Sequence, residues 1–230
     1  ALGHVQAREV VSESPRIVFP GNLQGRHANE TGTKGCELVT VEAGRVEAEF
    51  VALDVVRWSQ IALPLDGVER LESLGDAFRV SLEPVLIGAT DRLHAVRVTL
   101  TGSTDLHRIE ANRPGTLTAA VQAAAQDVSE AEIWIEQVRL DLSTPMDRPQ
   151  AAQRQDAVGE LIRLVDAIAR DEAELKRRAQ TELGDLLGAI PSEVATGELP
   201  RLDNSADLRA LLMDAEATVL ARLAAGTTST

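Results

Sequence analysis

Aromatic residues are scarce in this chain of 230 residues, which contains no tyrosine, three phenylalanines and two tryptophans. Its cores must therefore be built from leucine, valine, isoleucine and alanine. Bases of single-stranded nucleic acid are usually held by stacking on aromatic rings, so this composition argues against a stacking platform. The length allows two modest domains, or one domain with a helical extension.

Cysteine is nearly absent as well. The single Cys36 excludes an internal disulfide framework and favours a reducing, cytoplasmic setting, in which we expect this residue at a buried strand position. The chain has no apolar stretch long enough for a signal peptide or a membrane span, so we expect no membrane association. It also lacks an initiator methionine, and we interpret it as part of a longer protein.

Positive charge is in short supply, because 23 basic residues face 36 acidic ones and the formal net charge is -13. Affinity for a phosphate backbone comes from lysine and arginine, so this balance argues against the chain wrapping DNA by itself. The start of the chain is locally positive, however. Its basic residues are Arg8, Arg16, Arg26, His27 and Lys34, against Glu9, Glu13 and Glu30.

Residues 1–56 have the pattern of the last strands of a β-sandwich. A short strand over residues 16–19 ends at Pro20-Gly21, and a loop rich in glycine, asparagine and threonine continues to Gly35. Two alternating runs, residues 37–41 and 46–53, then predict a β-hairpin, with Gly44 suited to a positive φ in its turn.

Residues 57–145 predict a small α+β layer. Strands are expected over residues 58–65, 93–101 and 132–142, where apolar and polar side chains alternate. Between them, residues 68–78 place apolar side chains at helical spacing, and Pro114 can open a second helix. The resulting β-α-β-α-β order predicts helices against one face of a sheet.

Residues 146–230 predict a helical region. The stretch over residues 156–190 could be one helix or two, but Asp171 followed three residues later by Glu174 is typical of a helix start, which favours a break near Arg170. We expect Pro191 to end the second helix, and a linker over residues 192–203 to lead to a final helix. That helix should stop at Gly226, before a disordered tail.

Two stretches carry a resemblance to a known family. Residues 1–6 read ALGHVQ, which places His4 where an apolar run gives way to a loop, and residues 20–35 read PGNLQGRHANETGTKG. Together they resemble the end of the catalytic domain of calcineurin-like metallophosphoesterases, specifically bacterial DNA repair exonucleases of the SbcD and YhaO type. The last metal motif of that family is Gly-His-x-His. Without this context, His4 alone is more simply a turn histidine.

The resemblance implies a fold and an activity. It implies that residues 1–56 end a metallophosphoesterase β-sandwich, that residues 57–145 form a capping domain, and that residues 146–230 form a helical partner-binding region. It further implies a parent exonuclease that hydrolyses phosphodiesters with two Mn²⁺ ions. The earlier metal-binding motifs of this parent would lie upstream of Ala1. His4 maps to a metal ligand and Gln6 to a replaced histidine, whose amide oxygen is a weaker donor.

The same resemblance implies DNA and a protein as partners. It places Asn22, Arg26 and His27 in a loop near the active site and the DNA. The C-terminal helical segment of the family docks on the coiled-coil base of an SbcC-like ATPase, and the final helix here carries an apolar stripe that could serve this purpose. The contacting residues would be Leu208, Leu212, Ala215 and Val219. Such a stripe could instead pack on its own domain, or join two copies in a homodimer.

Two rival functions remain open from sequence alone. One is a non-catalytic interaction module in which Gln6 marks a degenerate metal site, and the other is a phosphoesterase acting on nucleotides or phosphoproteins. His94 and His107 lack cysteine or histidine neighbours at metal-ligand spacing, and we expect them to be surface or partly buried residues.

Overall fold

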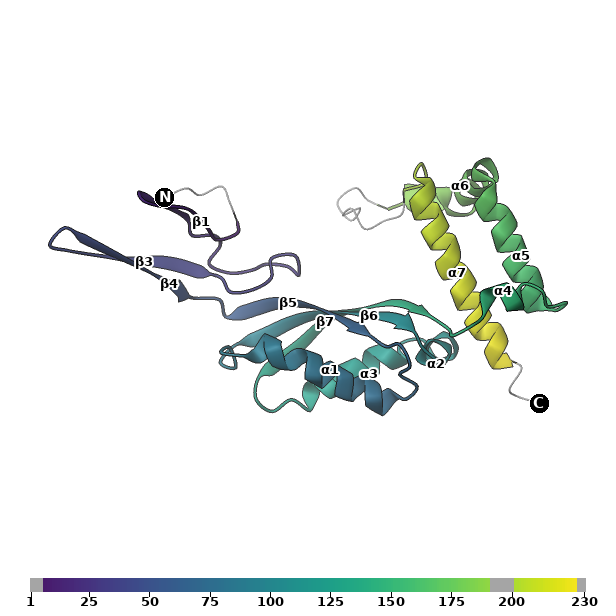
Figure 1. The fold of residues 1–230 in the computed structure, drawn as a ribbon, viewed down its shortest axis with the longest axis horizontal. Helices are drawn as coiled ribbons and strands as arrows, with labels where there is room; N and C mark the ends of the chain where they lie inside the picture. The colour runs from purple at the N-terminus through teal and green to yellow at the C-terminus, as the bar shows by residue number, and fades with distance from the viewer. Residues whose placement is uncertain (1–5, 191–200, 227–230) are drawn as a thin grey trace. The chain divides into compact units, whose positions relative to one another are not determined.

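The computed structural model describes residues 6–190 and 201–226, and it divides into two units (Figure 1). The first unit combines residues 1–102 with 115–142, and the second combines residues 103–114 with 143–230. Among the described residues, the first contains seven strands and two helices, and the second is helical. This mixture confirms the predicted α+β class. The division at residues 56 and 57 stays a prediction, since both sides of it lie in the first unit.

A three-stranded sheet is the centre of the first unit, with the order β5-β6-β7. Its strands are β5 (Val56–Pro64), β6 (Leu93–Ser103) and β7 (Glu132–Ser143). Strands β5 and β6 are parallel, from Val56 opposite Leu93 to Pro64 opposite Thr101. Arg97 on β6 bonds Glu136 on β7, 39 residues later. The same separation recurs where the Thr104 N–H donates to the Ser143 carbonyl, so β7 runs parallel to β6.

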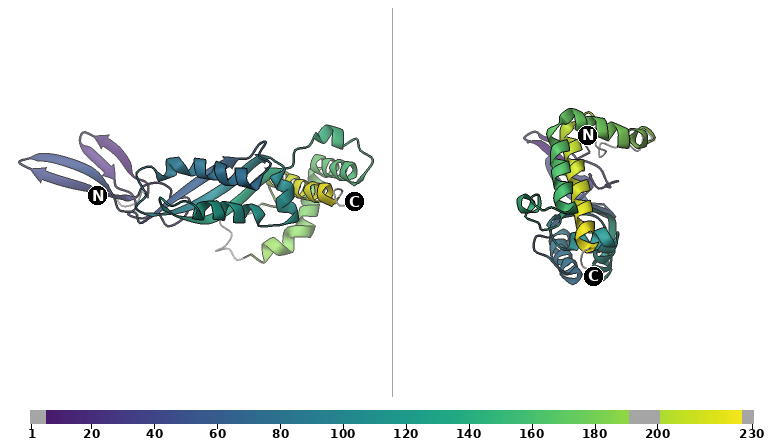
Figure 2. Two further views of the ribbon diagram at one scale, coloured as in Figure 1. Left: turned by 90° about the horizontal axis from the view of Figure 1, so that it is seen from below. Right: turned by 90° about the vertical axis from the view of Figure 1, so that its right-hand side faces the viewer.

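Parallel strands need long crossover connections, and here helices provide them. Helices α1 (Leu71–Leu86) and α3 (Thr116–Gln126) pack against each other on one face of the sheet (Figures 1 and 2). The predicted layer is therefore confirmed, although α1 continues beyond the predicted end at Phe78. The core between helices and sheet consists of Leu74, Phe78, Leu82, Val96, Val98, Leu100, Leu117 and Val121.

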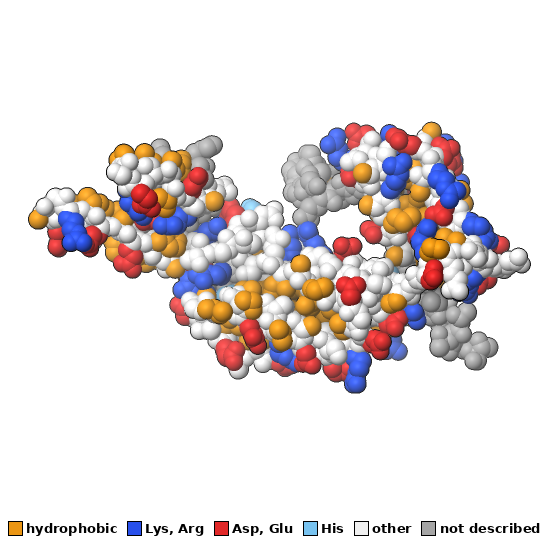
Figure 3. Space-filling model, viewed as in Figure 1, with side chains coloured by type: hydrophobic (Ala, Val, Ile, Leu, Met, Phe, Trp, Pro, Cys, Tyr) orange, Lys and Arg blue, Asp and Glu red, His pale blue; other side chains and the backbone are white. Residues whose placement is uncertain are grey.

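Two β-hairpins precede the sheet. Strands β1 (Glu9–Glu13) and β2 (Arg16–Phe19) form the first, and β3 (Gly35–Glu42) and β4 (Arg45–Ala52) form the second. The predicted turn of the second is confirmed, with Gly44 at a φ of 81°. Apolar side chains are exposed along this second hairpin, as Figure 3 also shows, and they include Leu38, Val39, Val41 and Val46. Cys36 lies on β3 as expected, but it is only half-buried because it borders the groove between the hairpins.

The second unit is built from α2 (Leu106–Asn112), α4 (Arg148–Ala151), α5 (Ala157–Arg170), α6 (Glu172–Gly188) and α7 (Ser205–Gly226). The predicted break near Arg170 is confirmed, because the Asp171 carboxylate caps α6 by accepting the Glu174 N–H at 3.0 Å. Pro191 and the C-terminal tail lie outside the described residues, as does most of the predicted linker. No described helix combines the length and the apolar character needed to cross a bilayer.

Two small cores hold the helices of the second unit together. In one, Ala151, Ile162 and Leu220 are buried against each other. In the other, Ile168 of α5 and Leu175 of α6 pack against α7. Helix α7 thus contributes to both cores, which makes it the element that ties α5 and α6 into one unit.

Candidate functional site

Four of the residues that the sequence singles out lie in or beside one loop, residues 21–34 of the first unit. His4 lies outside the described residues, but Gln6 precedes β1 and its backbone carbonyl accepts the Asn22 N–H at 3.0 Å. Gly21 permits this close approach: its φ is 78°, and a Cβ there would lie 2.8 Å from the Arg8 nitrogen. The Gly35 N–H donates to the Asn22 carbonyl at 3.2 Å, which fastens the loop to β3.

Gln6, Arg26 and His27 converge on Glu30, and we call these four residues the Glu30 cluster. Arg26 donates its backbone N–H to Glu30 Oε2 at 2.9 Å and its Nη2 to Glu30 Oε1 at 3.0 Å. With its amide oriented so that both atoms are satisfied, Gln6 donates Nε2 to Glu30 Oε1 at 3.0 Å and accepts from Arg26 Nη2 at 3.2 Å. His27 Nε2 lies 3.6 Å from Glu30 Oε1.

Glu30 is the buried member of this cluster, with 7% of its surface exposed. The side-chain hydrogen bond from Arg26, followed by the backbone hydrogen bond from the same residue, lowers the pKa of Glu30 to about 2. Sequence reasoning counted Glu30 only as an acidic neighbour of basic residues. The spacing of four residues between Arg26 and Glu30 is a local signal for their ion pair. The contact between Gln6 and Glu30 has no such signal, because the whole first hairpin lies between these two residues in the sequence.

The loop is also fastened to the edge of the sheet. Trp58 Nε1 donates to the Gly25 carbonyl at 3.0 Å, and the Gly32 N–H donates to the Trp58 carbonyl at 3.0 Å. Gln24 bonds the backbone of β5 as a neighbouring strand would, since its Oε1 accepts the Val56 N–H at 3.2 Å and its Nε2 donates to the Val56 carbonyl at 2.6 Å. The loop that carries the Glu30 cluster therefore completes the outer edge of β5.

The Glu30 cluster does not fit a metal site. Among the described residues, no group of three or more histidine, cysteine, aspartate or glutamate side chains is placed to hold a metal ion. The Gln6 amide oxygen faces the Arg26 guanidinium, which repels a cation, and the amide nitrogen is bonded to Glu30. In this arrangement, Gln6 is not turned to act as a ligand.

The predicted partner-binding stripe on α7 is divided between two environments. Leu208 is 2% exposed and packs against α5 and α6, and Leu212 is half-buried on the same cluster. Ala215 and Val219 are exposed. In this chain, the first two residues stabilise the helical unit, and the last two are available on its surface.

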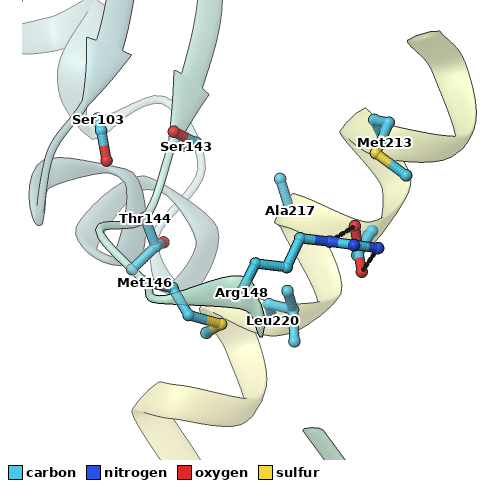
Figure 4. Close-up of a pocket in the computed structure, with 9 residues that line it drawn as sticks. Ser103, Ser143, Thr144, Met146, Arg148, Met213, Ala217 and Leu220 are labelled. Atoms are coloured by element: carbon cyan, nitrogen blue, oxygen red, sulfur yellow. Dashed lines mark hydrogen bonds and ion pairs between the residues drawn. The ribbon is translucent and has the colours of Figure 1, made fainter. Parts of the chain in front are cut away.

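A cavity lies beside α7 in the second unit. A cavity of about 300 Å³ is bordered by Ser143, Thr144, Met146, Arg148, Met213, Glu216 and Leu220, and Figure 4 shows how these side chains lie. Arg148 donates Nη2 to Asp166 at 2.6 Å and to Glu216 at 3.0 Å. These hydrogen bonds raise the pKa of Arg148, and two carboxylates neutralise its charge, so the cavity is not suited to an anion.

The two remaining described histidines have structural roles. His94 was expected to be a surface or partly buried residue, but it is fully buried on β6 and donates Nε2 to the Ala89 carbonyl at 2.8 Å. This expectation was wrong because the alternation of β6 turns His94 toward the helices. His107 is 9% exposed, lies 3.0 Å from Thr144 Oγ1 through its Nδ1, and has its pKa lowered by burial.

Two comparisons with known proteins relate this chain to metallophosphoesterases. Residues 58–143 match the family model described as the middle domain of metallophosphoesterase YhaO, and this range runs from β5 to the end of β7. Over 152 residues, the chain is 34% identical to an uncharacterized metallophosphoesterase YhaO of Bacillus subtilis (strain 168). The match covers 63% of this chain and 35% of that protein, so the chain spans about a third of the length of the relative. The chain is thus a relative of metallophosphoesterases.

Proposed function

We propose that this chain is the C-terminal portion of a metal-dependent DNA repair exonuclease of the SbcD and YhaO type. In this proposal, residues 57–145 cap the active site, and the loop over residues 21–34 borders it. The observation that carries the proposal is the match of residues 58–143 to the middle domain of a metallophosphoesterase, together with the resemblance over residues 1–35. Two Mn²⁺ ions would supply the nucleophile and charge neutralisation that phosphodiester hydrolysis needs.

In this proposal, the ions would be held by residues outside the described part of this chain. Gln6 is bonded to Glu30 and Arg26, so we derive from it no role in metal binding. His4 and upstream motifs of a longer parent chain would hold the metal. This chain's own contributions are the loop, the sheet domain that anchors it, and the exposed Ala215 and Val219, through which α7 would contact an SbcC-like ATPase.

The test compares this chain with a longer parent that includes the upstream sequence. Both are incubated with labelled duplex and single-stranded DNA in the presence of manganese. We expect the parent to degrade DNA and a chelator to abolish the degradation, whereas the 230-residue chain should be inactive. Chelator-sensitive degradation by the short chain, or none by the parent, would contradict the proposal.

One observation favours a second candidate function. Both polar atoms of the Gln6 side chain are used inside the Glu30 cluster, as expected if this position has lost its metal role. The alternative is a non-catalytic interaction module that assembles with an ATPase or with a second copy of itself. Upstream metal motifs in the parent, or their absence, would decide between the two.

A further inference from the structure

Arg26 is fastened at one end and open at the other. Its backbone N–H and its Nη2 are bonded to Glu30, while its side chain is 64% exposed and that of Glu30 is 7% exposed. Within residues 6–190 and 201–226, no other carboxylate lies within ion-pair distance of this guanidinium, and most of the side chain is open to solvent. The fork of a guanidinium binds two acceptor oxygens at once, and phosphate oxygens fit that geometry.

Glu30 and Gln6 fix the direction of this fork. Glu30 Oε1 accepts from both Arg26 and Gln6, and the Gln6 amide oxygen in turn accepts from Arg26 Nη2 at 3.2 Å. The three side chains therefore form a closed hydrogen-bonded ring. An arginine held in this way has already lost much of its side-chain freedom, so an anion that binds it incurs less of the entropy cost of ordering a long side chain.

The charge balance of the cluster indicates what kind of binding to expect. Glu30 neutralises Arg26, and His27, which is 57% exposed, adds positive charge only when protonated. The long-range electrostatic attraction between the cluster and an anion is consequently small. Directed hydrogen bonds from Arg26 must provide most of the affinity. Such a site would hold one phosphate of a chain that is bound elsewhere as well.

We propose that Arg26, oriented by Glu30 and Gln6, contacts a phosphodiester group of a nucleic-acid backbone, and that Gln6 is a positioning residue in place of a metal ligand. The choice of a nucleic acid as the source of the phosphodiester rests on the proposed function. The geometry of the cluster itself does not depend on that choice.

The experiment follows the Arg26 Nε–H signal of the 230-residue chain by NMR while dimethyl phosphate or a thymidine dinucleotide is added. We expect saturable shifts for both probes, and weaker shifts for acetate at equal concentration. Arg26→Gln should reduce the affinity, measured on neighbouring backbone signals, about tenfold or more, because a charge-assisted hydrogen bond is lost. Arg45→Gln is the control, since Arg45 is also exposed, at 81%, and lies at the tip of the second hairpin.

The Trp58 indole N–H reports whether the loop keeps its structure, because it donates to the Gly25 carbonyl. Gln6→Ala should weaken binding, because it loosens the guanidinium while the charges of Arg26 and Glu30 remain. If this variant moves the Trp58 signal, Arg26→Lys decides, since it keeps the charge and removes the fork. The proposal is overturned if Arg26→Gln binds like Arg45→Gln, if acetate binds as well as the phosphodiesters, or if no probe shifts Arg26.

The failure of this inference can be told apart from the failure of the proposed function. If the parent degrades DNA and Arg26→Gln leaves KM for DNA unchanged, the assignment of Arg26 is wrong and the nuclease function stands. If the parent does not degrade DNA while dimethyl phosphate still binds at Arg26, the nuclease function is wrong and this inference stands.

Discussion

Trp58 and Trp134 meet edge to face above the central strand of the sheet, with ring centroids 6.0 Å apart and planes at 71°. They come from the two outer strands, β5 and β7. Ala95, the register partner of Trp58, lies on β6 between them. Its small side chain leaves room for the two indoles to lean together. This pair is on the face opposite α1 and α3, and it joins strands that do not hydrogen-bond to each other.

Trp134→Ala should therefore destabilise the first unit by more than its exposure suggests. Trp134 is 51% exposed, and loss of an aromatic pair costs about 1 kcal/mol beyond the area term. Val80→Ala on α1 is the control, because Val80 is 65% exposed and its loss should change stability by less than about 0.5 kcal/mol. Urea unfolding followed by circular dichroism measures both. Equal midpoints for the two variants would show that the tryptophan pair does not stabilise the sheet.

Asp54 is a buried anion that holds two arginines, and its removal should be costly. Its side chain is fully buried, with Arg57 Nε at 2.8 Å and Arg92 Nη1 at 3.0 Å. Asp54→Asn removes the carboxylate partner of Arg57 and one of the two that Arg92 has, since Arg92 also pairs with Asp91 at 2.9 Å, and we expect a loss of about 3 kcal/mol or more. Asp127→Asn, at a side chain that is 73% exposed, serves as the control and should change stability little. A loss for Asp54→Asn as small as that of the control would contradict this expectation.

The contribution of Asp54 should depend on pH. Burial by itself would raise the pKa of Asp54, but the hydrogen bond and charge of Arg57, with help from the Lys34 N–H and Arg92, lower it overall. A carboxyl whose folded pKa is lowered stabilises the protein above its unfolded pKa of about 3.9, and that stability is lost as the pH falls through the folded value. The stability difference between wild type and Asp54→Asn should thus be constant near neutral pH and shrink below about pH 4.

Glu30 gives an independent pH test of the Glu30 cluster. With its pKa lowered to about 2 by Arg26, the cluster should persist on acidification well below the ordinary range for glutamate. Carbon-13 NMR of the Glu30 carboxyl should show a midpoint near 2, and the Trp58 indole signal should move with it as the loop loosens. In Arg26→Gln the midpoint should rise toward about 4.3. A wild-type midpoint already near that value would mean that the ion pair does not form.

Two residues of α7 should affect different properties, with Leu208 determining stability and Val219 determining partner binding. Leu208→Ala opens a cavity against α5 and α6 and should cost about 2–5 kcal/mol. Val219, at 42% exposed, can be changed to Asp with little effect on the thermal melt. If α7 docks on an SbcC-like ATPase through this surface, Val219→Asp should abolish binding.

The matched control is Ala210→Asp, at an exposed position nine residues earlier and so on the opposite side of the helix. Equal binding by Val219→Asp and Ala210→Asp would show that the partner does not use the surface around Val219.

Elements with a strong local pattern could be predicted from the sequence. Val96 and Val98 alternate with Arg97 on a strand that is buried on one side, and Asp171 has the side chain and spacing of a helix cap. In each case, the residues that determine the structure lie within a few positions of each other. Local periodicity and capping are then sufficient.

Elements that depend on distant contacts could not be predicted in this way. Strand β1 reads EVVSE and exists because it pairs with β2. Glu30 belongs to the same class, since its environment is set by Gln6.

Gln24 has a practical consequence for anyone who shortens this protein. Its side chain supplies hydrogen bonds to the backbone of β5 that no strand supplies, and Gly32 adds another at Trp58. A shorter protein that begins at residue 55 would contain the whole sheet but would expose the outer edge of β5. Unpaired edges of this kind join to one another between molecules. Such a truncation should aggregate, whereas one that begins at residue 21 should stay monodisperse.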